Sequence, residues 1–111
     1  MTFEEASKKA LVFRENRDWA QFHNPKDLAI SISIEAAELL ETFQWSGANL
    51  EVPEKVGYVK EELADVVIYC IYMADVLGVN LADVICDKID ANDRKYPVDK
   101  ARGNARKYTE L

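Results

Sequence analysis

The chain is 111 residues long, 49% hydrophobic and 31% charged, with a formal net charge of −6 at pH 7. This composition is typical of a folded globular domain and excludes a disordered chain, which would be poorer in apolar residues. The acidic balance argues against a general nucleic-acid-binding protein, because such proteins are normally basic. We therefore predict a single domain over residues 1–111 that does not bind nucleic acid.

Capping signals mark the first two helices. A capping box, formed by a threonine and a glutamate at residues 2–5, predicts a first helix that runs to about Arg17. The asparagine and proline at residues 24–25 suit the N-cap and the first position of a second helix. This second helix is predicted to run to about Trp45, and the serine and glycine at residues 46–47 end it.

Two further helices follow a connector that contains a proline. The third is predicted from about Glu54 to Leu77 and is closed by Gly78. The fourth is predicted from Leu81 to about Lys95, after an asparagine N-cap and before a proline. Because no segment alternates like a strand, the predicted fold class is all-α, most simply a four-helix bundle.

The second half of the third predicted helix is apolar almost all round. Such a helix is either central in its fold or shared between subunits, and oligomerisation is the better explanation in a chain this small. The run from Val66 to Val79 is interrupted by Asp75 and is too short to span a bilayer, and the N-terminus is too polar for a signal peptide. Cys70 and Cys86 are expected to be buried reduced thiols, which favours the cytoplasm and no membrane partner.

Residues from about 97 to 111 form a basic tail on the acidic body. Its charged residues are Lys100, Arg102, Arg106 and Lys107 against Asp99 and Glu110. Such a tail can meet the protein's own acids, a neighbouring subunit or an anionic ligand. A solvated and frayed terminus is an equal alternative.

Paired acids occupy faces of two helices that should be buried. In "SISIEAAELLETFQW", Glu35 falls inside the apolar stripe of the helix and Glu38 lies on the edge of that stripe. In "KEELADVVIYC", Glu62 and Asp65 are side by side on one helix face, and Asp65 points inward. The 23 residues between the two pairs let the second helix end, turn and return as the third. Antiparallel neighbours would bring four carboxylates into one cluster.

Four carboxylates that are partly out of water must be neutralised by protons or by cations. Oxygen-only ligands select hard ions, Mg²⁺ first and Mn²⁺ second. A di-iron bundle would need Glu-x-x-His pairs, whereas His23 is the only histidine. A single acid pair is usually a solvated helix face, as we expect for Glu41, but two inward-tilted pairs favour a metal site.

With these acid pairs, the chain resembles the all-α nucleoside triphosphate pyrophosphohydrolases, the MazG-like group, and most closely its dCTP pyrophosphatase branch. The shared segments are "RDWAQFH", "ETFQW", "EELADVVIYC", "DKIDANDRKYP" and "ARKYTEL", so the resemblance extends from about Phe13 to Leu111. It implies Mg²⁺-dependent hydrolysis of deoxynucleoside triphosphates, dCTP or modified dCTP first, to the monophosphate and pyrophosphate, as a pool-cleaning activity. It also implies a homo-oligomer, for which we predict a dimer-of-dimers tetramer with sites between subunits.

The resemblance assigns roles to the acid pairs. It makes Glu35, Glu38, Glu62 and Asp65 the metal ligands. Metal ions offset developing charge on the phosphates and lower the pKa of a bound water that attacks phosphorus. A carboxylate beside that water can accept its proton, and Glu38 is our candidate for this catalytic role.

The resemblance also assigns substrate-binding residues. The pattern K-x-x-x-N-x-x-x-Y-P implies that three residues bind the phosphates, namely Lys88, Asn92 and Tyr96. The walls of the base pocket would be Trp19, Trp45 and Tyr69, with Phe22 and His23 nearby. From the residues alone, Trp19, Trp45 and Tyr69 are more simply core aromatics, and Lys88 merely snorkels from an apolar stripe.

One departure from the family concerns the first helix. The closest members carry a histidine three residues before the phenylalanine matched by Phe13, and Ala10 stands there in this chain. The resemblance therefore implies no strict preference for cytosine. Two alternatives stay open: the same chemistry on another nucleotide such as dUTP, and a non-catalytic helical oligomer whose acids bind a metal ion or a basic partner for structure.

Overall fold

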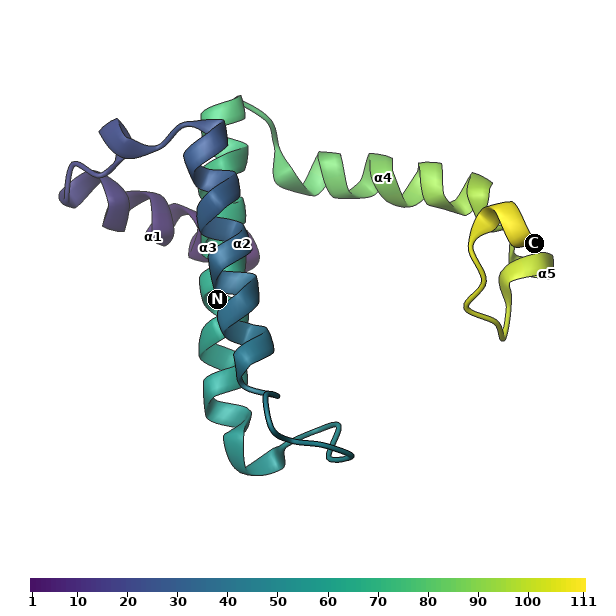
Figure 1. Ribbon diagram of the computed structural model, residues 1–111. Coiled ribbons are helices and arrows are strands. Elements are labelled where there is room, and N and C mark those ends of the chain that lie inside the picture. Colours follow the sequence, from purple (N-terminus) through teal and green to yellow (C-terminus); the bar gives the residue numbers. More distant parts are fainter. The chain divides into compact units, whose positions relative to one another are not determined.

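The computed structural model describes all 111 residues, and every regular element in it is helical. The chain divides into two compact units, Met1–Gly78 and Val79–Leu111, and each is described by itself. Four long helices, α1 to α4, correspond to the four main helices predicted, and no residue lies in a strand (Figure 1). The all-α prediction is therefore confirmed, while a single domain over residues 1–111 stays a prediction.

Helix α1 (Phe3–Asn16) begins where the capping box predicts. The Thr2 hydroxyl accepts from the backbone N–H of Glu5 at 3.1 Å, and the Glu5 carboxylate accepts from the backbone N–H of Thr2 at 3.3 Å. The helix ends at its C-cap, Arg17. A single 3₁₀ turn, η1 (Ala20–Phe22), then leads to the next helix.

Helix α2 (Pro25–Glu41) starts as predicted but ends earlier. The Asn24 side chain caps it by accepting from the backbone N–H of Asp27 at 2.9 Å. The predicted end at Trp45 is wrong, because the N–H groups of residues 42–44 bond to carbonyls three residues back, which tightens the chain into turns. Trp45 itself has φ 69°, a left-handed conformation that a helix cannot contain.

Helix α3 (Val56–Leu77) is preceded by the 3₁₀ turn η2 (Pro53–Lys55), so it starts slightly later than predicted. Its predicted end is confirmed. Gly78 takes φ 67° as the C-cap and its N–H bonds to the carbonyls of the last turn. Glycine suits this position because it adopts a left-handed conformation without a Cβ clash.

Helices α2 and α3 run side by side in opposite directions, and α1 packs against α3 (Figure 1). The small core contains Leu28 of α2 and Tyr72 of α3, which are 1% and 4% exposed. Two polar contacts join α1 to α3. The Tyr72 hydroxyl donates to the carbonyl of Ala10 at 2.9 Å, and the guanidinium of Arg14 donates to the carboxylate of Asp75 at 2.7 Å.

Large apolar side chains remain exposed on both helices of the central pair. Examples are Ile34 and Leu40 on α2, at 52% and 71%, and Leu63 and Leu77 on α3, at 54% and 55%. Packing within one chain therefore leaves part of the apolar surface of α3 exposed to solvent. No single helix is long and apolar enough to cross a membrane. One bent pair, Pro53–Leu77 with Leu81–Lys95, has the length and composition of a membrane span only when its two helices are counted together.

The second unit contains α4 (Leu81–Lys95), the short α5 (Val98–Ala101) and the 3₁₀ turn η3 (Tyr108–Glu110). Both cysteines are free thiols. Cys86 lies on α4, a helix with no buried side chain, and is exposed. The expectation of two buried thiols is therefore wrong, because Cys86 is exposed and Cys70 on α3 is only partly buried. The basic tail folds back, since the Tyr108 ring lies 6.0 Å from that of Tyr96 and 5.0 Å from the Lys95 ammonium.

Candidate functional site

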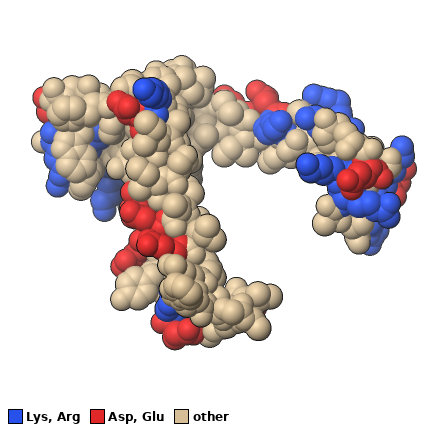
Figure 2. Space-filling model, in the orientation of Figure 1, with Lys and Arg blue, Asp and Glu red and all other residues tan.

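The antiparallel pairing of α2 and α3 brings their acids to the same level. Glu35, Glu62 and Asp65 each offer a carboxylate oxygen, and these three oxygens lie within 4.8 Å of one another. The Glu38 carboxyl also lies against those of Glu35 and Glu62. The predicted convergence of four carboxylates is therefore confirmed. We call these four residues the acid cluster, and Figure 2 shows acidic side chains gathered on this helix pair.

Two oxygens of the acid cluster have no partner. Glu35 Oε2 and Glu62 Oε2 are buried, and no donor in the protein hydrogen-bonds to either. The basic side chains that form ion pairs, Lys8 and Arg14, do so with other acids. A buried carboxylate oxygen without a donor destabilises the fold. A bound proton or cation would remove this penalty. An all-oxygen donor set of this kind fits a hard divalent ion.

Two carboxylates of the acid cluster also have raised pKa values. Burial, together with the neighbouring carboxylate of Glu38, raises the pKa of Glu35 from 4.5 to about 7. Burial and the neighbouring charge of Glu38 also raise the pKa of Glu62. In the absence of a cation, the cluster therefore retains a proton near neutral pH, whereas a bound divalent ion favours the ionised form.

The raised pKa of Glu35 predicts a pH-dependent stability for the metal-free protein. The folded state binds the proton of Glu35 more tightly than the unfolded state, where the pKa is 4.5. This contribution is present below pH 4.5 and is lost as the pH rises towards about 7. We expect the Tm of the wild type, relative to that of Glu35→Gln, to fall over this window in EDTA, as differential scanning fluorimetry can measure.

The comparison with Glu35→Gln is needed because His23 works in the opposite direction. Burial, and then the charge of Arg14, lowers the pKa of His23 from 6.5, so its contribution to stability grows as the pH rises. Both proteins contain His23, and its effect cancels in the difference. A difference in Tm that is constant from pH 4 to 8 would contradict the raised pKa of Glu35.

An apolar hollow of about 570 Å³ lies between α1, η1 and α3 and adjoins the acid cluster. Three of the residues predicted for a base pocket line it, namely Trp19, His23 and Tyr69, and Asp65 of the acid cluster forms part of its wall. Ala10, at the position where the resemblance implies a histidine, also lines the hollow. We call this hollow the apolar slot.

His23 is one of the polar residues that line the apolar slot. Its ring lies 5.1 Å from that of Tyr72 and is tilted by 32°. Its Nδ1 atom is buried and has no hydrogen-bond partner in the protein. Because the lowered pKa keeps the imidazole neutral at pH 7, one ring nitrogen can donate and the other accept a hydrogen bond.

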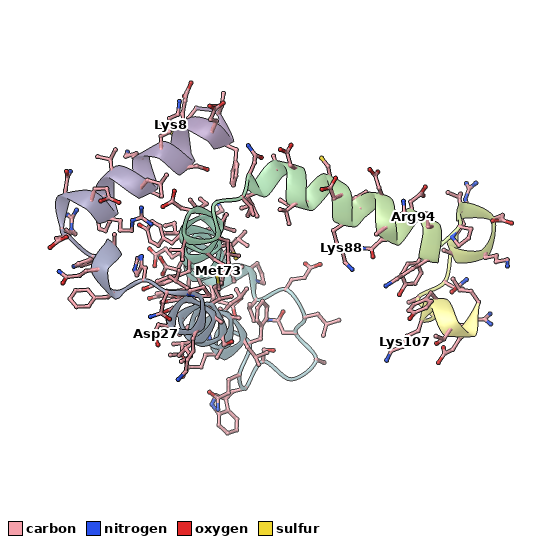
Figure 3. The ribbon with its side chains drawn as sticks, turned by 90° about the horizontal axis from the view of Figure 1, so that it is seen from above. Lys8, Asp27, Met73, Lys88, Arg94 and Lys107 are labelled. Atoms are coloured by element: carbon pink, nitrogen blue, oxygen red, sulfur yellow. The ribbon has the colours of Figure 1, made fainter.

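Some predicted site residues do not lie in the apolar slot. Trp45 and Phe22 do not line it and are 91% and 63% exposed. Lys88 and Asn92 are exposed on α4 in the second unit, where Figure 3 shows Lys88 projecting from the helix, and Tyr96 is its C-cap. The roles proposed for these residues stay predictions.

A second, polar hollow of about 430 Å³ adjoins the other side of the acid cluster. Three carboxylates, those of Glu38, Glu41 and Glu62, line it together with Thr42, Gln44, Lys55 and Tyr58. Sequence reasoning did not single out the last three residues. Gln44 follows α2, whereas Lys55 and Tyr58 lie at the start of α3. The sequence alone does not show that these two segments lie close together.

Comparisons with known proteins identify the family. The model of the MazG-like family matches residues 30–111. Proteins named dCTP pyrophosphatase 1 from Homo sapiens and Mus musculus are 38% and 37% identical to the chain over 115 residues, which covers 99% of this chain and 68% of each relative.

A solved structure is also similar. The crystal structure of a pyrophosphatase from Archaeoglobus fulgidus is 47% identical in sequence and matches with a TM-score of 0.77. The match covers 85% of this chain and 91% of that one. With helices, acid pairs and near full-length similarity in agreement, the chain belongs to the MazG-like family.

Proposed function

We propose that this chain hydrolyses dCTP, or a modified dCTP, to the monophosphate and pyrophosphate with the help of Mg²⁺. The broader class, a nucleoside triphosphate pyrophosphohydrolase, has the support of the MazG-like match and of the relatives named dCTP pyrophosphatase 1. The observation that carries the proposal is the acid cluster, with two buried oxygens that lack donors, beside an apolar slot.

The residues of the acid cluster fit the metal chemistry. Glu35, Glu38, Glu62 and Asp65 would hold the ions, which when bound offset the charge of the phosphates and acidify a water molecule. Glu38 is exposed and adjoins both the cluster and the polar hollow. This position supports Glu38 as the residue that would accept the proton of an attacking water.

The apolar slot supplies a place for the base. Trp19 and Tyr69 offer aromatic faces on which a flat ring can stack. The neutral His23 offers a hydrogen-bonding edge beside them. Because Asp65 belongs to both the slot and the acid cluster, a base bound in the slot has its phosphates next to the carboxylates.

Residues of the second unit are proposed to contact the phosphates. Lys88 and Asn92 are one helical turn apart on α4. With Tyr96 near the end of the helix, they would donate hydrogen bonds to phosphate oxygens. The exposed apolar side chains of α2 and α3 support a homo-oligomer, proposed as a tetramer with sites between subunits. Trp45, which is 91% exposed, would contribute to the base pocket in that assembly.

A panel of deoxynucleoside triphosphates tests the proposal. Wild-type protein with Mg²⁺ is incubated with dCTP, 5-methyl-dCTP, dUTP and dATP, and the products are identified by ³¹P NMR. We expect dCMP and pyrophosphate from dCTP. Release of orthophosphate would contradict the assigned bond, and a faster reaction of dUTP would favour the alternative specificity.

A second measurement distinguishes an enzyme from a structural metal-binding oligomer. A non-hydrolysable dCTP analogue with Mg²⁺ should raise the Tm beyond the effect of Mg²⁺ alone, because only a protein with a nucleotide site gains this extra stabilisation. An equal Tm in both conditions would favour the structural role.

A further inference from the structure

The polar hollow contains three side chains that can donate hydrogen bonds and have no partner in the protein. The Lys55 ammonium takes part in none of the ion pairs, which belong to Lys8 and Arg14. No side-chain hydrogen bond of the protein involves Lys55, Tyr58 or Gln44. Lys55 is half-buried, so its charge lies beside the acid cluster without being fixed to any acid.

The polar hollow, the acid cluster and the apolar slot each include residues of α3. Tyr58 of the hollow, Glu62 and Asp65 of the acid cluster, and Tyr69 of the apolar slot follow one another at intervals of three or four residues. At a rise of about 1.5 Å per residue, each is about 5–6 Å from the next along the axis. The polar hollow, the acid cluster and the apolar slot therefore succeed one another along the helix.

A nucleoside triphosphate has the same sequence of chemical groups. Its base is flat and apolar, the α-phosphate is the reacting group, and the β- and γ-phosphates form a polyanionic end. With the base in the apolar slot and the α-phosphate at the acid cluster, the polyanionic end extends about one helical turn further. That distance reaches the polar hollow.

We propose that Lys55, assisted by Tyr58 and Gln44, binds the β- and γ-phosphates and hence the pyrophosphate that leaves. This inference rests on the proposed function. Glu38, Glu41 and Glu62 also line the hollow, so the polyphosphate would enter it as its Mg²⁺ complex, whose ions would offset these three carboxylates. The Lys55 ammonium supplies positive charge at the far end, and the Tyr58 hydroxyl and Gln44 amide supply neutral donors.

The test compares Lys55→Ala with a matched lysine variant, Lys60→Ala. Both lysines lie at the start of α3, but Lys60 is exposed and does not line the polar hollow. Lys55 is the N-cap of α3 without any capping side-chain hydrogen bond, so its replacement leaves the helix start intact, as the Tm of each variant can verify. Calorimetry with pyrophosphate and Mg²⁺, and separately with dCMP, gives the Kd values.

We expect Lys55→Ala to weaken pyrophosphate binding about tenfold, the effect typical of a lost charge-assisted hydrogen bond. The Kd of dCMP should be unchanged, Lys60→Ala should match the wild type, and Lys55→Arg should restore most of the pyrophosphate affinity. In the reaction, the KM for dCTP should rise while kcat changes little.

Other outcomes overturn the inference. An unchanged Kd for pyrophosphate in Lys55→Ala, or an equal loss in Lys60→Ala, would show that Lys55 makes no specific contact. Equal weakening of dCMP and pyrophosphate would place Lys55 at the α-phosphate instead. A wild type that releases no pyrophosphate from any triphosphate would contradict the proposed function itself, whereas an active wild type with an unaltered Lys55→Ala variant contradicts only the subsite.

Discussion

Replacing Glu62 by glutamine is expected to lower kcat/KM for dCTP by about 10³-fold, the scale of losing a group that stabilises transition-state charge. Glu62 Oε2 is buried without a donor, and its carboxylate lies within 4.8 Å of those of Glu35 and Asp65. The amide keeps the shape of the side chain but removes the negative charge that a divalent ion requires. Steady-state release of pyrophosphate at several Mg²⁺ concentrations measures the effect.

The neighbouring Glu61→Gln variant is the matched control. Glu61 is exposed and does not belong to the acid cluster, so its replacement should leave kcat/KM within about twofold of the wild type, as for other surface substitutions. The Tm of metal-free Glu62→Gln should equal or exceed that of the wild type, because an uncompensated carboxylate is removed. Full activity in Glu62→Gln would contradict the assignment of the acid cluster as the metal site.

The second large effect is expected at Arg14, whose replacement by alanine should lower the free energy of unfolding by about 2–3 kcal/mol. Arg14 is 5% exposed, and its guanidinium donates to Glu15 at 2.6 Å and to Asp75 at 2.7 Å. The contact with Asp75 holds α1 against α3, where the two helices form the apolar slot. Chemical denaturation at fixed protein concentration measures the loss.

Arg17→Ala is the corresponding control on the same helix. The Arg17 guanidinium lies 3.6 Å from the centre of the Phe13 ring, at the surface, and removing an exposed contact of this kind costs about 0.5–1 kcal/mol. The partner variant Asp75→Ala should also cost less than Arg14→Ala, because the Asp75 side chain is 44% exposed and its loss leaves Arg14 paired with Glu15. Equal losses in all three variants would show that the Arg14–Asp75 contact does not hold the helices together.

Local signals in the sequence were sufficient for most of the fold. The capping side chains of Thr2 and Asn24, and the left-handed Gly78, act through bonds within a few residues, so their effects could be predicted from neighbouring residues alone. The end of α2 could not. The tight turns of residues 42–44 and the positive φ of Trp45 depend on how the connector returns to α3, which no local pattern specifies.

The acid cluster was predictable for a related reason. Helical periodicity fixes which acids share a face, and the connector over residues 42–55 lets α3 return antiparallel to α2. The polar hollow was not predictable, because Gln44 and Lys55 lie in irregular segments whose side-chain directions follow no period. The apolar slot was found only in part, since Ala10 and Tyr72 enter it through the packing of α1 on α3.

Asp65 belongs to both the acid cluster and the apolar slot, and this shared position couples two equilibria. A ligand that fills the slot changes the surroundings of one of the carboxylates that would hold the ion. By thermodynamic linkage, the factor by which an occupied slot changes the affinity for the ion is also the factor by which the ion changes the affinity for that ligand. For the proposed function, one coupling free energy would therefore link the affinity for the base to the affinity for the ion.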